Sequence, residues 1–252
     1  MTDFIGDDLS GARFERVNLT GARMRRINMT GIEMRGALVQ DARLIGLELW
    51  NVEITGELLN VTVNGVDIGP LVEAELNRRM PDRARMRPTD AAGFREAWDI
   101  LEHRWDGIVE RARALPPEAL HHGVGGEWSF IQTLRHLSFA TAAWVGRMML
   151  GNPTPWHPLD LPWDEAPGWD GIPWDREVQP SLDEVVTLRR ERQTMVRDVI
   201  ASLTDEQLAT HVSRTEPGWP QLTDFPVREC LSIVLNEEWE HAGFAERDLA
   251  AP

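Results

Sequence analysis

A helical stretch near the C-terminus, LSIVLNEEWEHAGFAERDL at 231–249, carries acidic and imidazole side chains inside an apolar pattern. At helical spacing, Glu237 and His241 share one stripe with Val234 and Phe244, so both side chains are expected to face inward on adjacent turns. A buried carboxylate without a partner is costly. A carboxylate and an imidazole four residues apart can both reach one divalent ion, which predicts a metal site on this helix.

Such a site needs a third ligand from a neighbouring helix. His136 is the only histidine in the helical stretch WSFIQTLRHLSFATAAW at 128–144. The other histidines are less suitable, because they lie beside charges within a helix, in turns or in a proline-rich loop; they are His103, His121, His122, His157 and His211. Spacing alone leaves three interpretations open, namely a metal site, a Glu–His ion pair and a solvated helix face.

Four amphipathic segments are predicted to position these residues, at about 90–114, 129–150, 181–202 and 226–249. The second and third begin with capping boxes, formed by Ser129 with Gln132 and by Ser181 with Glu184. A further short turn is expected at Thr204–Gln207. Four long amphipathic helices predict a four-helix bundle.

The segment at 152–180 joins two of these helices and is long for a loop inside a compact domain. It contains seven prolines and four tryptophans, which are Trp156, Trp163, Trp169 and Trp174. We interpret it as an ordered flap over one end of the bundle, with the metal site beneath it. The alternative is that the tryptophans only seal the hydrophobic core.

The first sixty residues repeat with a period of five. The first position of each unit is apolar throughout, from Phe4, Leu9 and Phe14 to Leu44 and Leu59. A second, smaller column stands two residues before it. A period of five fits neither a helix nor a simple strand, but it fits a solenoid whose large column points inward while the positions between face solvent.

This pattern resembles the pentapeptide-repeat family over about residues 2–63, which implies a right-handed quadrilateral β-helix of about three coils. A turn at Asn64-Gly65 and a short helix from about Pro70 to Arg79 are expected to cap it. Some members of this family imitate DNA. Because this module is short and nearly neutral, a structural or oligomerising role is favoured over DNA mimicry.

Four motifs of the helical part resemble the DinB-like metalloprotein superfamily, closest to its branch of mycothiol-dependent enzymes: ERARALPPEAL, GEWSFIQTLRHL, SLTDEQL and LNEEWEHAGFAERDL. The resemblance covers about residues 90–250. It implies a divalent metal, usually zinc or nickel, held by one histidine of the second helix and two histidines four apart on the fourth. His136 and His241 match these positions, whereas Glu237 replaces the commoner second histidine. The resulting set still suits Zn²⁺ and admits Fe²⁺.

The resemblance implies a transferase or isomerase in which the metal activates a small thiol, such as mycothiol, for attack on an electrophilic substrate. Glu238 is the candidate acceptor or general base, with a solvent-facing position as the alternative. Arg247, or else Arg135, is the candidate for binding a carboxylate of the thiol or substrate, with surface charge as the alternative. Cys230 is expected in the core. The competing functional class is a non-catalytic, metal-stabilised interaction or dimerisation scaffold.

The composition of the 252 residues sets further expectations. The net charge is −15, and −14 of it lies in residues 89–252, which disfavours nucleic acid and anionic membranes as partners. The one cysteine excludes an intramolecular disulfide and a Cys-based zinc cluster. No membrane span or signal peptide is recognised, so we expect a cytoplasmic protein. The resemblance to the DinB-like superfamily and the exposed end of a short solenoid imply a homodimer, and the expected partner is a small-molecule substrate. The predicted fold is a multidomain α+β protein, with a β-helix at 1–68, a capping helix and linker at 69–88 and a DinB-like bundle at 89–252.

Overall fold

The structure is a computed structural model that describes residues 3–250. Residues 1, 2, 251 and 252, which the predicted domain limits include, lie outside this range. The chain divides into two compact units, of which one ends at Gly56 and the other begins at Glu57.

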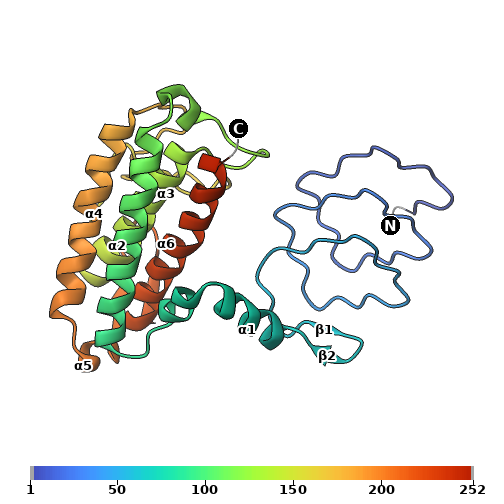
Figure 1. The fold of residues 1–252 in the computed structure, drawn as a ribbon, viewed down its shortest axis with the longest axis horizontal. Coiled ribbons are helices and arrows are strands. Elements are labelled where there is room, and N and C mark those ends of the chain that lie inside the picture. Colours follow the sequence, from blue (N-terminus) through green and yellow to red (C-terminus); the bar gives the residue numbers. More distant parts are fainter. Residues whose placement is uncertain (1–2, 251–252) are drawn as a thin grey trace. The chain divides into compact units, whose positions relative to one another are not determined.

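The backbone of the N-terminal unit repeats with the period of its sequence. Left-handed φ values recur every five residues, at Gly6, Gly11, Arg16, Gly21, Arg26, Gly31, Gly36, Asp41, Gly46 and Asn51. At three positions ten residues apart, a side-chain oxygen accepts a hydrogen bond from the amide two positions later: Asp8 accepts from Ser10, Asn18 from Thr20 and Asn28 from Thr30. The chain thus winds in successive coils with a turn at each unit (Figure 1).

The interior of this unit differs from the predicted β-helix. Residues 3–56 contain no strand or helix, and the backbone hydrogen bonds found there close single turns, such as Ala12 to Leu9. The apolar column is exposed rather than inward, with Leu9 44% and Leu44 72% accessible. Without ladder hydrogen bonds to draw neighbouring coils together, the coils leave the column open to solvent.

The second unit begins with a hairpin and a helix. Strands β1 (Thr62–Val63) and β2 (Val66–Asp67) pair antiparallel around Asn64-Gly65, where both residues have positive φ. This geometry is that of a tight hairpin turn. Helix α1 (Gly69–Arg79) follows, with a proline in its first turn. The turn and the helix predicted at 64–79 are therefore confirmed.

Among its described residues, the second unit contains four long helical segments. They are α2 (Ala91–Arg113), α3 (Phe130–Thr141) with its π-helical continuation η3 (Ala142–Met149), α4 (Leu182–Ser202) and α6 (Val227–Ala250). The shorter elements are η1 (Pro81–Met86), η2 (Pro117–His121) and α5 (Asp205–Leu208). Both predicted capping boxes are present, at Ser129 and Ser181. The short turn expected at Thr204–Gln207 is also present and begins with a capping box of its own.

The long helices pack in a cycle. Both α2 and α3 contact α4 and α6 (Figure 1). Two clusters of buried apolar side chains fill the space between them, one around Trp98, Leu101 and Val234 and the other around Trp105 and Leu134. Among the described residues, no helix is both long and apolar enough to cross a membrane.

A second hairpin, not predicted from the sequence, precedes α6. Strands β3 (His211–Arg214) and β4 (Leu222–Pro226) pair antiparallel with an irregular register. The buried Arg147 of η3 holds the connecting loop by donating to the carbonyls of Glu216 and Pro220, at 2.5 and 3.2 Å. These hydrogen bonds attach the loop of the hairpin to η3, the continuation of α3.

Candidate metal centre

Helices α3 and α6 bring the three predicted metal ligands together. Nε2 of His136 lies 3.3 Å from Oε2 of Glu237, and Nε2 of His241 lies 3.2 Å from the same oxygen. One donor atom from each residue lies within 4.8 Å of the other two. Glu237 and His241 occupy adjacent turns of α6, as their spacing predicts.

The three side chains are mostly buried but keep partial exposure. Their exposed fractions are 11% for His136, 31% for Glu237 and 17% for His241. Burial acts to raise the pKa of the Glu237 carboxyl, but hydrogen bonds and charge from the two histidines outweigh it and hold this pKa at about 2. Glu237 is therefore ionised, which is the state required of a carboxylate ligand.

The two donor separations that involve Glu237 fit a divalent ion. Ligands about 2.0–2.1 Å from a tetrahedral zinc ion lie about 3.3–3.4 Å from one another. The two His–Glu separations of 3.2 and 3.3 Å agree with this value. Two imidazoles and one carboxylate also leave a coordination position open, as in catalytic zinc sites.

The loop between η3 and α4 fixes the orientation of His136. Nδ1 of His136 lies 3.0 Å from the carbonyl oxygen of Leu161. A carbonyl can only accept, so this contact assigns a proton to Nδ1 and turns Nε2, the other ring nitrogen, toward Glu237 as the atom that would bind a metal. A ligand histidine is commonly held by such an outer hydrogen bond.

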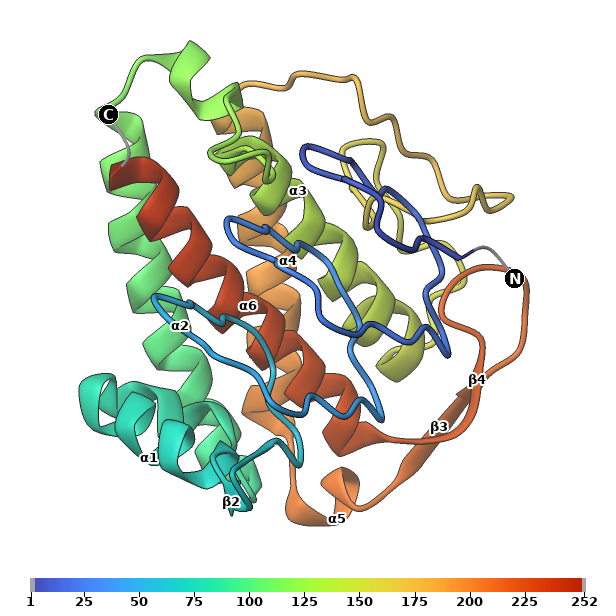
Figure 2. The same ribbon diagram turned by 90° about the vertical axis from the view of Figure 1, so that its right-hand side faces the viewer.

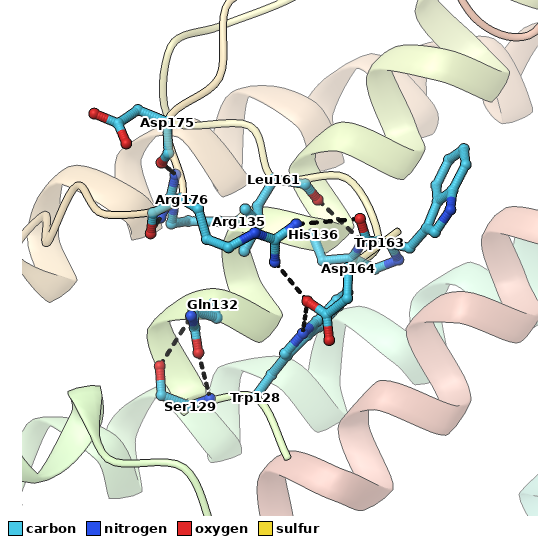
Figure 3. A network of polar contacts seen from close by, with 10 residues as sticks. All are labelled: Trp128, Ser129, Gln132, Arg135, His136, Leu161, Trp163, Asp164, Asp175 and Arg176. Atoms are coloured by element: carbon cyan, nitrogen blue, oxygen red, sulfur yellow. Dashed lines mark hydrogen bonds and ion pairs between the residues drawn. The ribbon is translucent and has the colours of Figure 1, made fainter. Parts of the chain in front are cut away.

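The neighbouring residue on α3, Arg135, anchors the same loop at a second place. Its buried guanidinium donates to the carbonyls of Leu159 at 2.8 Å and Val178 at 3.1 Å, and also to that of Asp175 (Figure 3). Arg135 is therefore neither a surface charge nor free to bind a substrate carboxylate. The loop lies along α3 (Figure 2).

Aromatic rings surround the two histidines. The centroid of the Trp128 ring lies 4.6 Å from that of the His136 ring and 6.0 Å from that of the His241 ring, to which it is nearly parallel. Phe139, one turn after His136, is buried among half-buried tryptophans; they are Trp156, Trp163, Trp169 and Trp219. The loop tryptophans thus pack on α3 beside the site.

Glu238 does not occupy the solvent-facing position considered from the sequence. It is 1% exposed, and both of its oxygens accept from Nη2 of the buried Arg189 of α4, at 2.7 and 2.8 Å. Burial raises the pKa of the Glu238 carboxyl even though Arg189 opposes that shift. The ion pair stabilises the packing of α6 on α4. To act as the predicted base, Glu238 would have to exchange its contact with Arg189 for one with the substrate proton.

Two other candidates lie away from the donors. Arg247 pairs with its neighbour Asp248 and lies over the Phe244 ring, and Phe244, whose ring lies beside that of His241, connects it to the site. Cys230 is fully buried, and burial raises the pKa of its thiol to about 12. Cys230 is therefore a core residue, as expected.

Arg189 was not singled out from the sequence, although a signal was present. It lies on the stripe of α4 that also contains the buried Val185 and Val196. A charged residue on an apolar stripe indicates a buried partner. Identifying that partner as Glu238, 49 positions away, required the fold.

Asp160, at the base of the loop, gives a pH-dependent prediction. Burial raises the pKa of this carboxyl from 3.8 to about 6, against the attraction of Arg192 and a hydrogen bond from the His157 amide. A raised folded-state pKa contributes stability below about pH 4 that is lost as the pH rises through about 6. Relative to the parent protein, Asp160→Asn should therefore gain roughly 3 kcal/mol of unfolding free energy between pH 4 and 7.

Urea unfolding of both proteins across this pH range measures that difference. Asp170→Asn, an exposed carboxylate on the same loop, is the matched control and should show a flat difference. A flat difference for Asp160→Asn as well would show that its carboxyl titrates normally in the folded protein.

Comparisons with known proteins agree with this arrangement. A family model of the DinB superfamily matches residues 100–245, and a model of pentapeptide repeats matches residues 2–36 in eight copies. No curated protein and no solved structure matches the chain. The DinB match covers more than half of the chain and contains all three candidate ligands. The chain therefore belongs to the DinB superfamily, with pentapeptide repeats preceding its DinB domain.

Proposed function

We propose that this protein is a divalent-metal-dependent transferase or isomerase that activates a low-molecular-weight thiol, of the mycothiol type, for attack on an electrophilic small molecule. The observation that carries the proposal is the set of His136, Glu237 and His241, whose donor atoms are close enough to share one ion and are reachable from outside. The contacts of α2 and α3 with both α4 and α6 support a four-helix bundle as its frame.

The residues of the site have separate tasks in this proposal. His136, Glu237 and His241 would hold Zn²⁺, with Ni²⁺ or Fe²⁺ as alternatives that the donor set also accepts. Bound there, a divalent ion supplies a Lewis acid that lowers the pKa of a thiol. In the transfer, sulfur bonds to the electrophilic carbon, the leaving group departs with its electron pair, and the thiol proton passes to solvent.

The surroundings favour a thiol and a substrate without strong negative charge. Three arginines around the site are already engaged, Arg135 by loop carbonyls, Arg189 by Glu238 and Arg176 by Asp164. Trp128 offers an aromatic face beside both histidines. Binding through stacking and apolar contact is thus favoured over ion pairing.

The test begins with elemental analysis of protein purified without an affinity metal. The protein loaded with Co²⁺ is then titrated with mycothiol and N-acetylcysteine while the visible absorption of the metal is recorded, and is assayed with 1-chloro-2,4-dinitrobenzene as the electrophile. A thiol-dependent change in absorption and product formation are expected. Metal binding that raises thermal stability without any thiol response would favour the non-catalytic scaffold instead.

We further propose that the N-terminal repeats close into the squared β-helix implied by their period. The five-residue recurrence of left-handed φ supports this arrangement. Leu44→Asp should then destabilise the module by several kcal/mol, because a charge would be placed in a narrow interior. Arg43→Asp, at an outward position, is the matched control.

Limited proteolysis followed by mass spectrometry reads this effect within residues 1–60. Faster cleavage of Leu44→Asp than of Arg43→Asp is expected. Equal cleavage of the two variants and the parent would show that the apolar column is exposed in solution, as it is in the open coils described above, and would contradict the proposal.

A homodimer is also proposed, because the repeat module offers apolar side chains such as Ile45 and Trp50 on its surface. Sedimentation velocity at micromolar concentration should give twice the mass of 28.6 kDa. A single species at the monomer mass across that range would contradict the prediction.

A further inference from the structure

The loop residue Asp164 holds a side chain that lies against both candidate histidine ligands. Its carboxylate accepts a hydrogen bond from Nε1 of Trp128 at 2.9 Å (Figure 3). The indole of Trp128 in turn lies 4.6 Å from the His136 ring and 6.0 Å from the His241 ring. Asp164 is thus two contacts from the metal donors, although it lies 28 positions after His136 in the chain.

The backbone of Trp128 is fixed separately from its side chain. The next residue, Ser129, caps α3 and exchanges hydrogen bonds with Gln132. This cap fixes the backbone position from which the Trp128 side chain extends, but not the side-chain torsion angles that orient the indole ring. The contact with Asp164 is the polar constraint on that rotation, since the indole has only one donor.

The acceptor itself is held from the far end of the loop. Arg176 donates to the same oxygen of Asp164 at 2.5 Å and to the carbonyl of Trp163 at 3.2 Å. The carbonyls of residues 175, 176 and 178 in turn accept from Arg135, next to the ligand His136. These contacts form a closed circuit from α3 through the loop and back to Trp128.

We propose that Asp164 is a positioning residue of the metal centre, which holds the Trp128 indole against His136 and His241 and so makes the loop one wall of the site. The contribution of Asp164 to metal binding rests on the proposed function. The positioning of the Trp128 indole by Asp164 rests on the hydrogen bonds described above. Arg176 supports it by fixing Asp164, and Trp128 is the surface that a bound thiol or substrate meets beside the histidines.

Three variants test the proposal in the metal-free and zinc-loaded protein. Asp164→Ala removes the acceptor, Trp128→Phe removes the donor and keeps an aromatic ring, and the double variant removes both. Glu165→Ala, which deletes a neighbouring exposed carboxylate on the same loop, is the matched control. Asp164 is itself exposed, so folding should survive, and Asp164→Asn provides a variant that keeps an acceptor.

The first measurement uses no metal. In amide and indole NMR spectra, the Trp128 indole signal is assigned by its loss in Trp128→Phe. In Asp164→Ala this proton should exchange with solvent faster, and the ring signals of His136 and His241 should shift, whereas Asp164→Asn and Glu165→Ala should resemble the parent. An Asp164→Ala spectrum that matches the Glu165→Ala spectrum overturns the proposal.

The second measurement is zinc affinity by competition with a chelating dye. Loss of an outer partner of a metal site commonly weakens binding 10–100-fold, so a loss of about 10-fold is expected for Asp164→Ala and for Trp128→Phe. The double variant should lose no more than Trp128→Phe alone, because both changes act through one contact. Fully additive losses contradict the proposal. If the parent binds none of Zn²⁺, Ni²⁺ and Fe²⁺, the proposed function fails, while the metal-free spectra still decide the role of Asp164.

Discussion

Replacing His241 with alanine is expected to abolish tight metal binding and thiol-dependent activity together. Among the residues that the structure describes, three donors converge at the site, so the variant would retain His136 and Glu237, which form a weak two-ligand set. Changes in the outer partners of metal ligands already cost 10–100-fold in affinity, so loss of a ligand should exceed about 100-fold. Competition titration with Zn²⁺ measures the affinity.

Two further variants sharpen that test. Glu237→His restores the histidine expected more commonly at this position and should retain the metal. His103→Ala removes an exposed histidine of α2 and should bind zinc like the parent. Zinc at 100 times its dissociation constant should stabilise the parent by about 2.7 kcal/mol but leave His241→Ala unchanged. Equal stabilisation of both proteins would place the ion elsewhere.

The largest loss of stability is expected from Arg189→Met. This change leaves Glu238 almost fully buried without its cation, and breaking a buried ion pair by removing one partner costs about 3–5 kcal/mol. Urea unfolding followed by far-UV circular dichroism measures the loss. Arg190→Met, at the adjacent exposed position, is the matched control and should change stability by no more than about 0.5 kcal/mol.

The double variant Arg189→Met with Glu238→Gln separates this cause from lost packing. Removing the charge of both partners should restore part of the stability, because no unpaired ion stays buried. If the double variant is as unstable as Arg189→Met alone, the Arg189 side chain contributes mainly through its contacts, including that with the Trp105 ring.

Local sequence signals predicted the helices and their caps well. Ser129 with Gln132 and Ser181 with Glu184 are patterns confined to one helical turn, and each places a helix start correctly. The i, i+4 spacing of Glu237 and His241 likewise determined that they would adjoin. Such features depend on few residues close in the chain, so tertiary contacts do not override them.

Features that depend on pairing across the chain were not predictable in the same way. The β3–β4 hairpin is held partly by Arg147 from η3, and the loop position of Asp164 is set by Arg176 and Trp128. In the N-terminal unit the period of five was visible, but whether coils close depends on hydrogen bonds between them. A single sequence does not specify those partners.

Three buried arginines hold irregular segments by their main-chain carbonyls. Arg135 and Arg192 donate hydrogen bonds to carbonyls of the 152–180 loop, and Arg147 donates to carbonyls of the loop between β3 and β4. Every residue has a main-chain carbonyl whatever its side chain, so many loop residues can be replaced over evolutionary time without loss of these hydrogen bonds. Selection can therefore alter the surface beside the histidines while the scaffold stays constant, and homologues with unlike loops should share these arginines before they share any loop residue.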